Sequence, residues 1–197
     1  MAGIAKRFRT GTKRWSMAAS AIMFGGIALA ACGSPAKTTA QAPKASKAVQ
    51  NLAVEVETGK MDGKAGWPRF VPSSLTVKAN QPVRLVITSY DDGTAPLPSA
   101  LVTYDKVAGG TETVGGVALT SVKNSEVSHT FTVPQLGLNA VIPAAPSNGS
   151  VKVVFTFTPT KSGTFTWQCY APCGSGSDGM GGAMVTKGWM TGSLQVS

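Results

Sequence analysis

Two cysteines four positions apart lie in one glycine-rich segment near the end of the chain. Cys169 and Cys173 are followed by Met180, and His129, the only histidine, lies upstream. Thiolate and thioether sulfurs are soft donors, which suit copper better than hard cations such as Mg²⁺ or Ca²⁺. The same two thiols could instead form a disulfide, which persists outside the cytoplasm. The segment therefore indicates either a copper site or a disulfide-closed loop.

The residues around this segment resemble the copper-binding domain of cytochrome c oxidase subunit II, which belongs to the cupredoxin family. In that family a strand carrying one histidine precedes a Gly-aromatic strand that enters a Gln-Cys-x-x-x-Cys-Gly loop. Segments 128–139 and 163–184 have this order here. The framing residues of the family pattern match at Gly163, Phe165, Gln168 and Gly174.

The resemblance implies a set of copper ligands. These are His129, Cys169, Cys173 and Met180. Ala171 stands where the family has an acidic residue that lends its backbone carbonyl, so Ala171 could serve in the same way. Ser177 stands where the family has its second histidine, and no other histidine can replace it. We therefore expect at most one tightly held copper ion, not the two-histidine dinuclear centre.

Other chemistries find less support in the sequence. Met184 and Met190 are interpreted as packing residues, with copper delivery as the alternative. Ser177, Asp178 and His129 have the residue types of a hydrolytic triad, but no nucleophile elbow surrounds the serine. The sequence contains no phosphate-binding loop, paired-carboxylate site or Cys-x2-Cys zinc spacing. We therefore expect a carrier and not an enzyme.

The first 31 residues predict a targeting segment. Five basic residues precede an apolar stretch, 17–31, that is shorter than the roughly 20 residues needed to span a bilayer. The stretch ends in Leu-Ala-Ala-Cys, which resembles the lipobox of bacterial lipoproteins. The resemblance implies that residues 1–31 are a signal peptide, that cleavage precedes Cys32, and that Cys32 is lipidated. An extracytoplasmic protein anchored to the cell membrane is expected.

The charge of the chain follows mainly from this segment. Of the 18 Lys and Arg residues, five lie in the signal segment, so the mature chain carries 13 against nine Asp and Glu. A nucleic-acid interface needs basic residues clustered on one face, and the sequence has no such cluster. Nucleic acid is therefore not an expected partner.

The rest of the chain divides into a tether and one domain. Residues 32–50 are rich in Ala, Pro, Lys, Ser and Thr and predict a disordered tether after the lipidated cysteine. Residues 51–197 show short apolar segments with a period of two, which predict strands. The predicted fold is an all-β, antiparallel Greek-key β-sandwich, cupredoxin-like, with an insertion around 89–126. An extra strand is predicted over 101–107.

Together these features predict a lipid-anchored protein that binds copper and transfers electrons or holds copper for a respiratory or envelope partner. The alternative is a metal-free β-sandwich binding module with a Cys169–Cys173 disulfide. A catalytic oxidase subunit is not favoured, because subunit II is normally anchored by transmembrane helices and this chain shows only the lipid-anchor signal. A redox or copper-delivery protein is the expected partner.

Overall fold

The structure, a computed structural model, describes residues 47–197. The predicted signal peptide, Cys32 and all but the last residues of the tether lie outside the described residues, so the expectations about them stay predictions. The first strand begins at Gln50, next to the predicted start of the domain. Among residues 47–197, no helix is long and apolar enough to cross a membrane.

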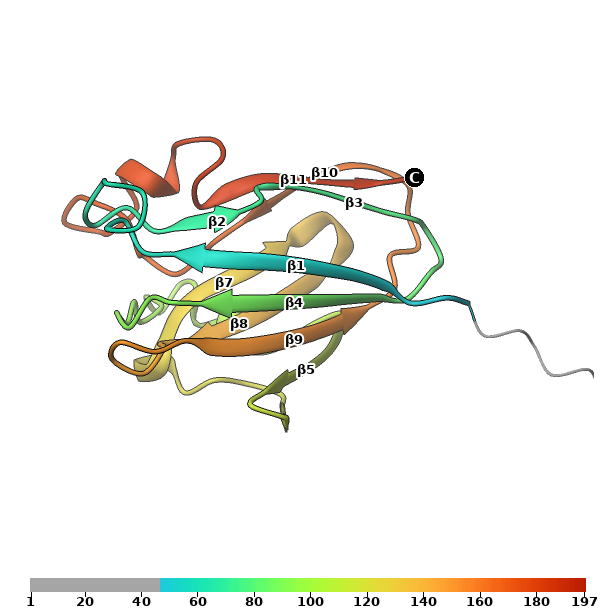
Figure 1. Cartoon of the computed structure of the whole chain (residues 1–197), viewed down its shortest axis with the longest axis horizontal. Helices are drawn as coiled ribbons and strands as arrows, with labels where there is room; N and C mark the ends of the chain where they lie inside the picture. The colour runs from blue at the N-terminus through green and yellow to red at the C-terminus, as the bar shows by residue number, and fades with distance from the viewer. Residues whose placement is uncertain (1–46) are drawn as a thin grey trace, which may run out of the picture. The chain divides into compact units, whose positions relative to one another are not determined.

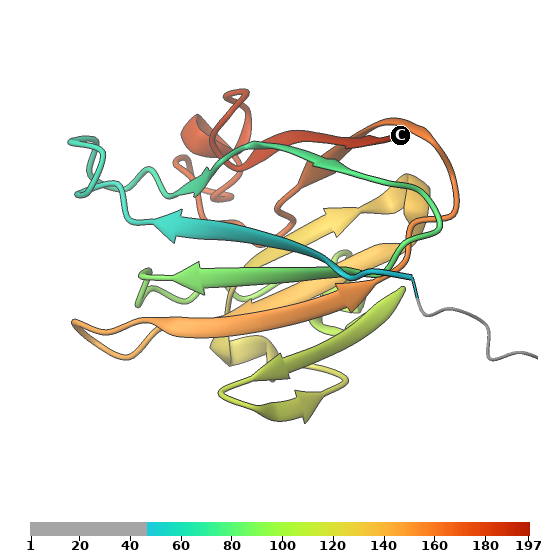
Figure 2. The same ribbon diagram turned by 45° about the vertical axis from the view of Figure 1, so that its right-hand side comes forward.

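Two β-sheets make up the domain (Figures 1 and 2). The first sheet has the strand order β2-β1-β4-β9-β5-β6, and the second has the order β3-β11-β10-β7-β8. The strands of the first sheet are β1 (Gln50–Glu57), β2 (Arg69–Val71), β4 (Val83–Ser89), β5 (Gly110–Val114), β6 (Val117–Leu119) and β9 (Val151–Phe157). The strands of the second sheet are β3 (Ser74–Val77), β7 (Val127–Val133), β8 (Leu138–Pro143), β10 (Gly163–Gln168) and β11 (Thr191–Val196). The predicted all-β sandwich is confirmed.

Both sheets are mixed, which differs from the antiparallel pairing that the sequence predicted. Strand β1 runs parallel to β4, and β3 runs parallel to β11. The other strand pairs are antiparallel. After β1 the chain passes through β2 and then through β3 of the second sheet before it returns as β4. Such a crossover lets β4 start at the same end as β1, whereas a tight hairpin reverses the direction.

The core lies between the two sheets and follows the predicted period of two. Alternate residues of β4 and β9 are buried, namely Val83, Leu85, Ile87, Val153, Phe155 and Phe157. Strand β7 differs, because it is buried along its whole length. One of its faces packs on core aromatics such as Phe70, and Thr130 on the other face accepts a hydrogen bond from the backbone N–H of Tyr170.

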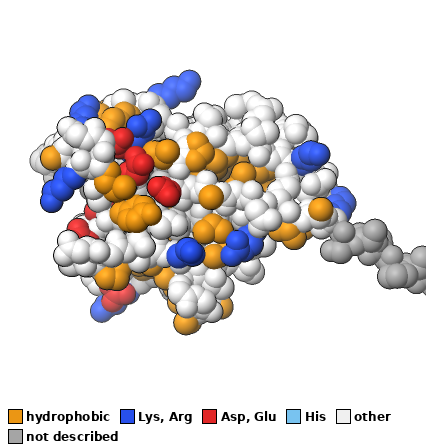
Figure 3. Space-filling model, viewed as in Figure 1, with side chains coloured by type: hydrophobic (Ala, Val, Ile, Leu, Met, Phe, Trp, Pro, Cys, Tyr) orange, Lys and Arg blue, Asp and Glu red, His pale blue; other side chains and the backbone are white. Residues whose placement is uncertain are grey.

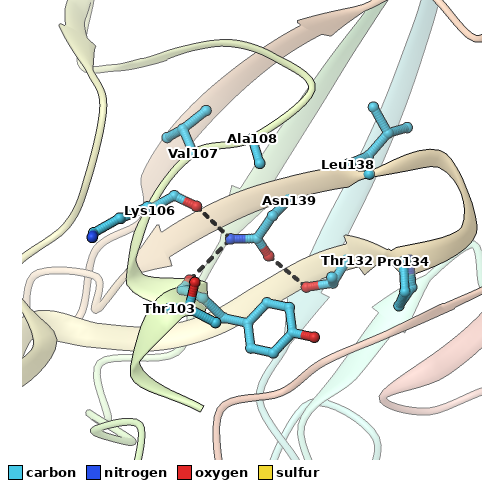
Figure 4. Close-up of a pocket in the computed structure, with 10 residues that line it drawn as sticks. Thr103, Lys106, Val107, Ala108, Thr132, Pro134, Leu138 and Asn139 are labelled. Atoms are coloured by element: carbon cyan, nitrogen blue, oxygen red, sulfur yellow. Dashed lines mark hydrogen bonds between the residues drawn. The ribbon is translucent and has the colours of Figure 1, made fainter.

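The insertion folds back over β8. It contains a 3-10 turn η1 (Val102–Asp105), the hairpin β5–β6 and a second turn η2 (Asn124–Glu126). The strand predicted over 101–107 is wrong, since η1 occupies most of this segment. The Asn139 amide holds the segment by donating to the carbonyl oxygens of Tyr104 and Lys106, at 2.9 and 2.7 Å (Figure 4). A buried amide whose partners are all in place fixes the path of a loop that lacks ladder hydrogen bonds.

Candidate metal centre

Pairing between distant strands brings the predicted ligands together. His129 lies on β7, and Cys169 directly follows β10. These two strands pair antiparallel at Gln168 and Thr132, which places the end of β10 beside the last residues of β7 and lets the chain after it run back toward His129. Cys173 follows in the loop after β10. The imidazole and the two sulfurs offer ligand atoms that all lie within 4.8 Å of one another.

The two cysteines are free thiols in the structure. Their sulfur atoms are 3.6 Å apart, whereas a disulfide bond measures about 2.05 Å. Cys169 is fully buried, and its sulfur accepts a hydrogen bond from the backbone N–H of Thr130 at 3.3 Å. Cys173 is only partly buried. One thiol is therefore part of the core, and the other lies at its edge.

The thioether beside the cysteines belongs to Met184. Its sulfur is 3.3 Å from the sulfur of Cys173, and the side chain is 2% exposed. Met180, the methionine that the resemblance implied as a ligand, lies on the turn before it and is partly buried, and its backbone N–H donates to Asp178. Met184 was interpreted as a packing residue. The structure thus places a sulfur next to Cys173, but from a methionine four residues later than expected.

Glycine makes this arrangement possible. The turn after Cys173 is closed by backbone hydrogen bonds between Ser175 and Gly181, and Met180 lies at its base, directly before Gly181. The 3-10 turn η4 (Gly182–Met184) then brings Met184 back beneath Gly174. A Cβ at Gly174 would overlap the carbonyl oxygen of Gly181 and crowd the Met184 side chain. Only glycine permits this close approach.

Two other predicted positions are also placed by the structure. Ala171 is buried, and its carbonyl oxygen lies 3.5 Å from the sulfur of Cys169 while it also accepts the N–H of Cys173. Ser177, at the position of the family's second histidine, is exposed on the turn. The backbone carbonyl of Ala171 therefore lies beside the Cys169 sulfur, and its role as a metal ligand stays a prediction.

A carboxylate holds His129 in place. The Asp91 side chain accepts a hydrogen bond from Nε2 of His129 at 3.0 Å. His129 is completely buried, and within residues 47–197 its Nδ1 has no hydrogen-bond partner. A histidine that binds a metal through one ring nitrogen commonly donates the other N–H to a carboxylate. The unpaired Nδ1 is therefore the atom that fits a metal.

The protonation of the metal-free cluster follows from these contacts. Burial lowers the pKa of His129, but the hydrogen bond to Asp91 and the neighbouring Cys169 outweigh this effect and raise the pKa to about 9. Burial raises the pKa of Cys169, yet the hydrogen bond with Cys173 and the positive charge of the neighbouring His129 hold it well below its usual range. The pKa of Cys173 is raised by its hydrogen bond to Cys169 and by burial. Of the two sulfurs, that of Cys169 therefore ionises more readily, beside an imidazole whose pKa is raised.

The donor set fits a copper ion. One imidazole with two thiolates would also suit zinc. The thioether of Met184 and the buried apolar surroundings favour a softer metal, and Cu(I) prefers such sulfur donors. The ring of Phe70 packs edge-on against His129, and the buried Trp167 packs on Phe70. These aromatic side chains form a rigid wall behind the imidazole.

Asp91 was missed by the sequence reasoning, and Met184 was seen but assigned to packing. Asp91 lies in a turn, in which its Oδ1 accepts the N–H of Gly93. Its other oxygen binds a histidine 38 residues away, for which the sequence carries no signal. A second unpredicted contact is the parallel stack of Tyr104 on Tyr170, with ring centroids 4.2 Å apart.

A separate cavity of about 460 Å³ lies beside this tyrosine stack. Tyr104, Lys106, Leu138 and Asn139 are among its lining residues (Figure 4). The polar atoms of the Asn139 side chain are already paired with protein groups. No candidate ligand of the metal centre lines this cavity. It is therefore a feature of the insertion and not of the site.

No protein-family model matches the chain, and no curated protein matches it. Several solved structures align with it. The metal-binding domain of the Cu(I)-exporting P-type ATPase CopA from Streptococcus pneumoniae shows 11% identity and a TM-score of 0.36, covering 76% of this chain and 86% of that one. Rusticyanin from Thiobacillus ferrooxidans shows 15% identity and a TM-score of 0.36, covering 76% and 77%. Auracyanin A, a blue copper protein from Chloroflexus aurantiacus, shows 15% identity and a TM-score of 0.35, covering 76% and 100%.

Proposed function

We propose that the protein binds one copper ion and holds it for a partner protein of the cell envelope. The observation that carries this proposal is the buried Nδ1 of His129, which has no hydrogen-bond partner within residues 47–197 and lies beside two cysteine sulfurs. A buried polar atom without a partner costs free energy, so its retention beside soft donors favours a metal ligand. The ligands would be His129, Cys169, Cys173 and Met184.

Each residue of the cluster has a distinct role in this proposal. Asp91 fixes the tautomer of His129, so that Nδ1 is free to bind. The backbone N–H of Thr130 fixes the position of the Cys169 sulfur and stabilises its thiolate. The Cys173 thiol and Nδ1 of His129 would each lose a proton to solvent when metal binds, because only the thiolate and the neutral imidazole are ligands. Bound copper would supply one-electron redox chemistry.

Electron transfer is the second candidate function, and one contact favours it. Tyr170 directly follows Cys169, and its ring stacks on Tyr104 at an angle of 4°. This pair joins the cysteine loop to the partly exposed insertion through aromatic rings in contact. Neither function requires catalysis by the chain itself, in line with the expectation of a carrier.

We also propose that the protein is an extracytoplasmic lipoprotein anchored to the cell membrane. The lipobox before Cys32 supports this localisation.

Titration of the reduced protein with Cu(I) tests the proposal. We expect one copper ion per chain, held more tightly than zinc, because the cluster offers a single imidazole and a thioether. The measurement is elemental analysis after dialysis, with zinc as the competing metal. Two copper ions per chain would instead support a dinuclear centre with a borrowed ligand. The absence of binding, together with a mass two protons lower than that of the reduced chain, would support the metal-free disulfide module.

The two methionines give a matched pair of variants. Met184→Leu is expected to weaken Cu(I) binding several-fold, because it removes the sulfur that lies 3.3 Å from Cys173 while keeping the packing volume. Met180→Leu should leave the affinity unchanged. Competition with a chromophoric Cu(I) chelator measures both affinities. If only Met180→Leu lowers the Cu(I) affinity, then Met180 and not Met184 is the ligand, as the family resemblance implies.

A further inference from the structure

Two cavities meet at Cys173. One has a volume of about 270 Å³ and is lined by Asp91, Thr94 and Cys173 among others. The other, of about 230 Å³, is lined by Thr58, Lys60 and again Asp91 and Cys173. Both lie between the loop after β1 and the loop after β4. Each cavity can hold several water molecules, since one water occupies about 30 Å³.

The other ligand atoms are closed to these cavities. His129 and Cys169 are completely buried, and neither lines the two cavities. Met184 is 2% exposed and is also absent from their walls. The turn that carries Ser177, where the family has its second histidine, contributes no residue from 175 to 181 to either wall. Of the four candidate ligands, Cys173 is thus the one that external groups can reach.

We propose that Cys173 is the sulfur through which copper is exchanged with an external thiolate that enters by these cavities. The proposal rests on the copper-holding function above and adds the route and the chemical class of the exchange partner. The incoming sulfur takes the place of Cys173 on Cu(I). Cys173 takes up the proton that the incoming thiol has lost, so that neither the net charge nor the oxidation state changes.

Cu(I) prefers soft sulfur donors, so a thiolate is the external group that suits the place of Cys173. The walls carry charges of both signs, because Lys60, Asp91 and Asp92 all line one of the cavities. At this end of the molecule, basic, acidic and hydrophobic side chains are interspersed on the face that Figure 3 shows. A mixed surface of this kind admits both a low-mass thiol and the cysteine of a protein loop.

Alkylation of the metal-free protein tests the access to Cys173. Iodoacetamide should label Cys173 in the folded protein and leave Cys169 unlabelled, as peptide mass spectrometry can determine. Thr94→Trp and Thr58→Trp each fill one cavity, and each should slow the labelling of Cys173, with a several-fold effect when combined. Ser162→Trp, in the exposed turn before β10, is the control and should not change the rate. Equal labelling of both cysteines in the folded wild type would overturn the proposal.

Copper release tests the exchange itself and separates the two sources of thiolate. The copper-loaded protein is mixed with reduced glutathione or with a cysteine peptide fused to a folded carrier protein. Release to both probes shows that a protein-borne thiolate can enter as well as a low-mass thiol, and release to glutathione alone restricts the route to a low-mass thiol. Both rates should fall in the tryptophan variants, although their copper content stays at the wild-type value. If the wild type and the tryptophan variants bind copper and release it equally fast, the exchange route is wrong but the copper-holding function stands. If the protein binds no copper, the proposed function itself is wrong.

Discussion

Cys169→Ser is expected to abolish tight copper binding. Cys169 is the fully buried sulfur of the cluster, and its thiolate is stabilised by hydrogen bonds from Cys173 and from the backbone N–H of Thr130, and by the charge of His129. A serine hydroxyl in the same place is a neutral, hard donor that copper binds poorly. Removal of a residue that hydrogen-bonds to a metal ligand typically lowers the affinity for the metal by about 10–100-fold. Removal of the ligand itself should therefore lower the copper affinity by more than about 100-fold. Cu(I) competition titration measures this loss.

Cys32→Ser is the matched control for this variant. It removes the third cysteine of the chain, which lies outside the described residues, and it should leave the copper affinity unchanged. The same control tests the lipobox, because the variant should remain an unlipidated precursor. Wild-type affinity in Cys169→Ser would contradict the cluster as the copper site.

Glu112→Gln is expected to remove a large part of the pH dependence of stability. Glu112 lies on β5 of the insertion and is 1% exposed. Its Oε2 accepts the backbone N–H of Val141 at 2.9 Å, whereas its Oε1 has no partner among the described residues. Burial raises the pKa of this carboxyl to about 7, despite the opposing hydrogen bond from Val141.

The sign of the effect follows from this raised pKa. The folded state holds the proton more tightly than the unfolded state, whose carboxyl has a pKa of 4.5. Stability therefore falls as the pH rises from below 4.5 to above 7, by about 3 kcal/mol at roughly 1.4 kcal/mol per pKa unit. Above pH 7 the full cost of the buried charge remains. Glutamine does not titrate, so this contribution should be absent from the variant.

Urea unfolding of the metal-free protein from pH 4 to pH 8 measures the difference between wild type and variant. Other titrating groups, including His129, are common to both proteins and cancel. The amide of glutamine leaves an unpaired N–H group, so the diagnostic quantity is the slope with pH and not the absolute stability. Glu55→Gln, at an exposed position on β1, is the control and should keep the wild-type slope. Parallel curves for wild type and Glu112→Gln would show that the buried carboxyl does not titrate in this range.

The sequence determined the local features of the protein. The alternation of apolar residues in 83–88 and 151–157 predicted two strands whose alternate side chains are buried, because a period of two places one set of side chains on the core face. The cysteine spacing and the single histidine predicted a cluster of soft donors, and His129, Cys169 and Cys173 do lie together. The insertion around 89–126 stays a prediction, which rests on the resemblance to the family pattern.

Only the tertiary structure decided which further atoms complete the cluster. Asp91 reaches His129 because the loop after β4 passes the middle of β7, and this contact between distant segments leaves no trace in residue spacing. The choice of Met184 over Met180 depends on glycines with positive φ, such as Gly179 and Gly182, which close a turn that the distance along the sequence does not describe. Burial of Glu112 and the opening at Cys173 likewise arise from packing between loops and strands that are remote in the chain. The sequence states which side chains are present, and this was enough to predict a site of soft donor atoms. Which of these side chains meet depends on contacts between segments far apart in the chain, and those contacts are formed only in the folded protein.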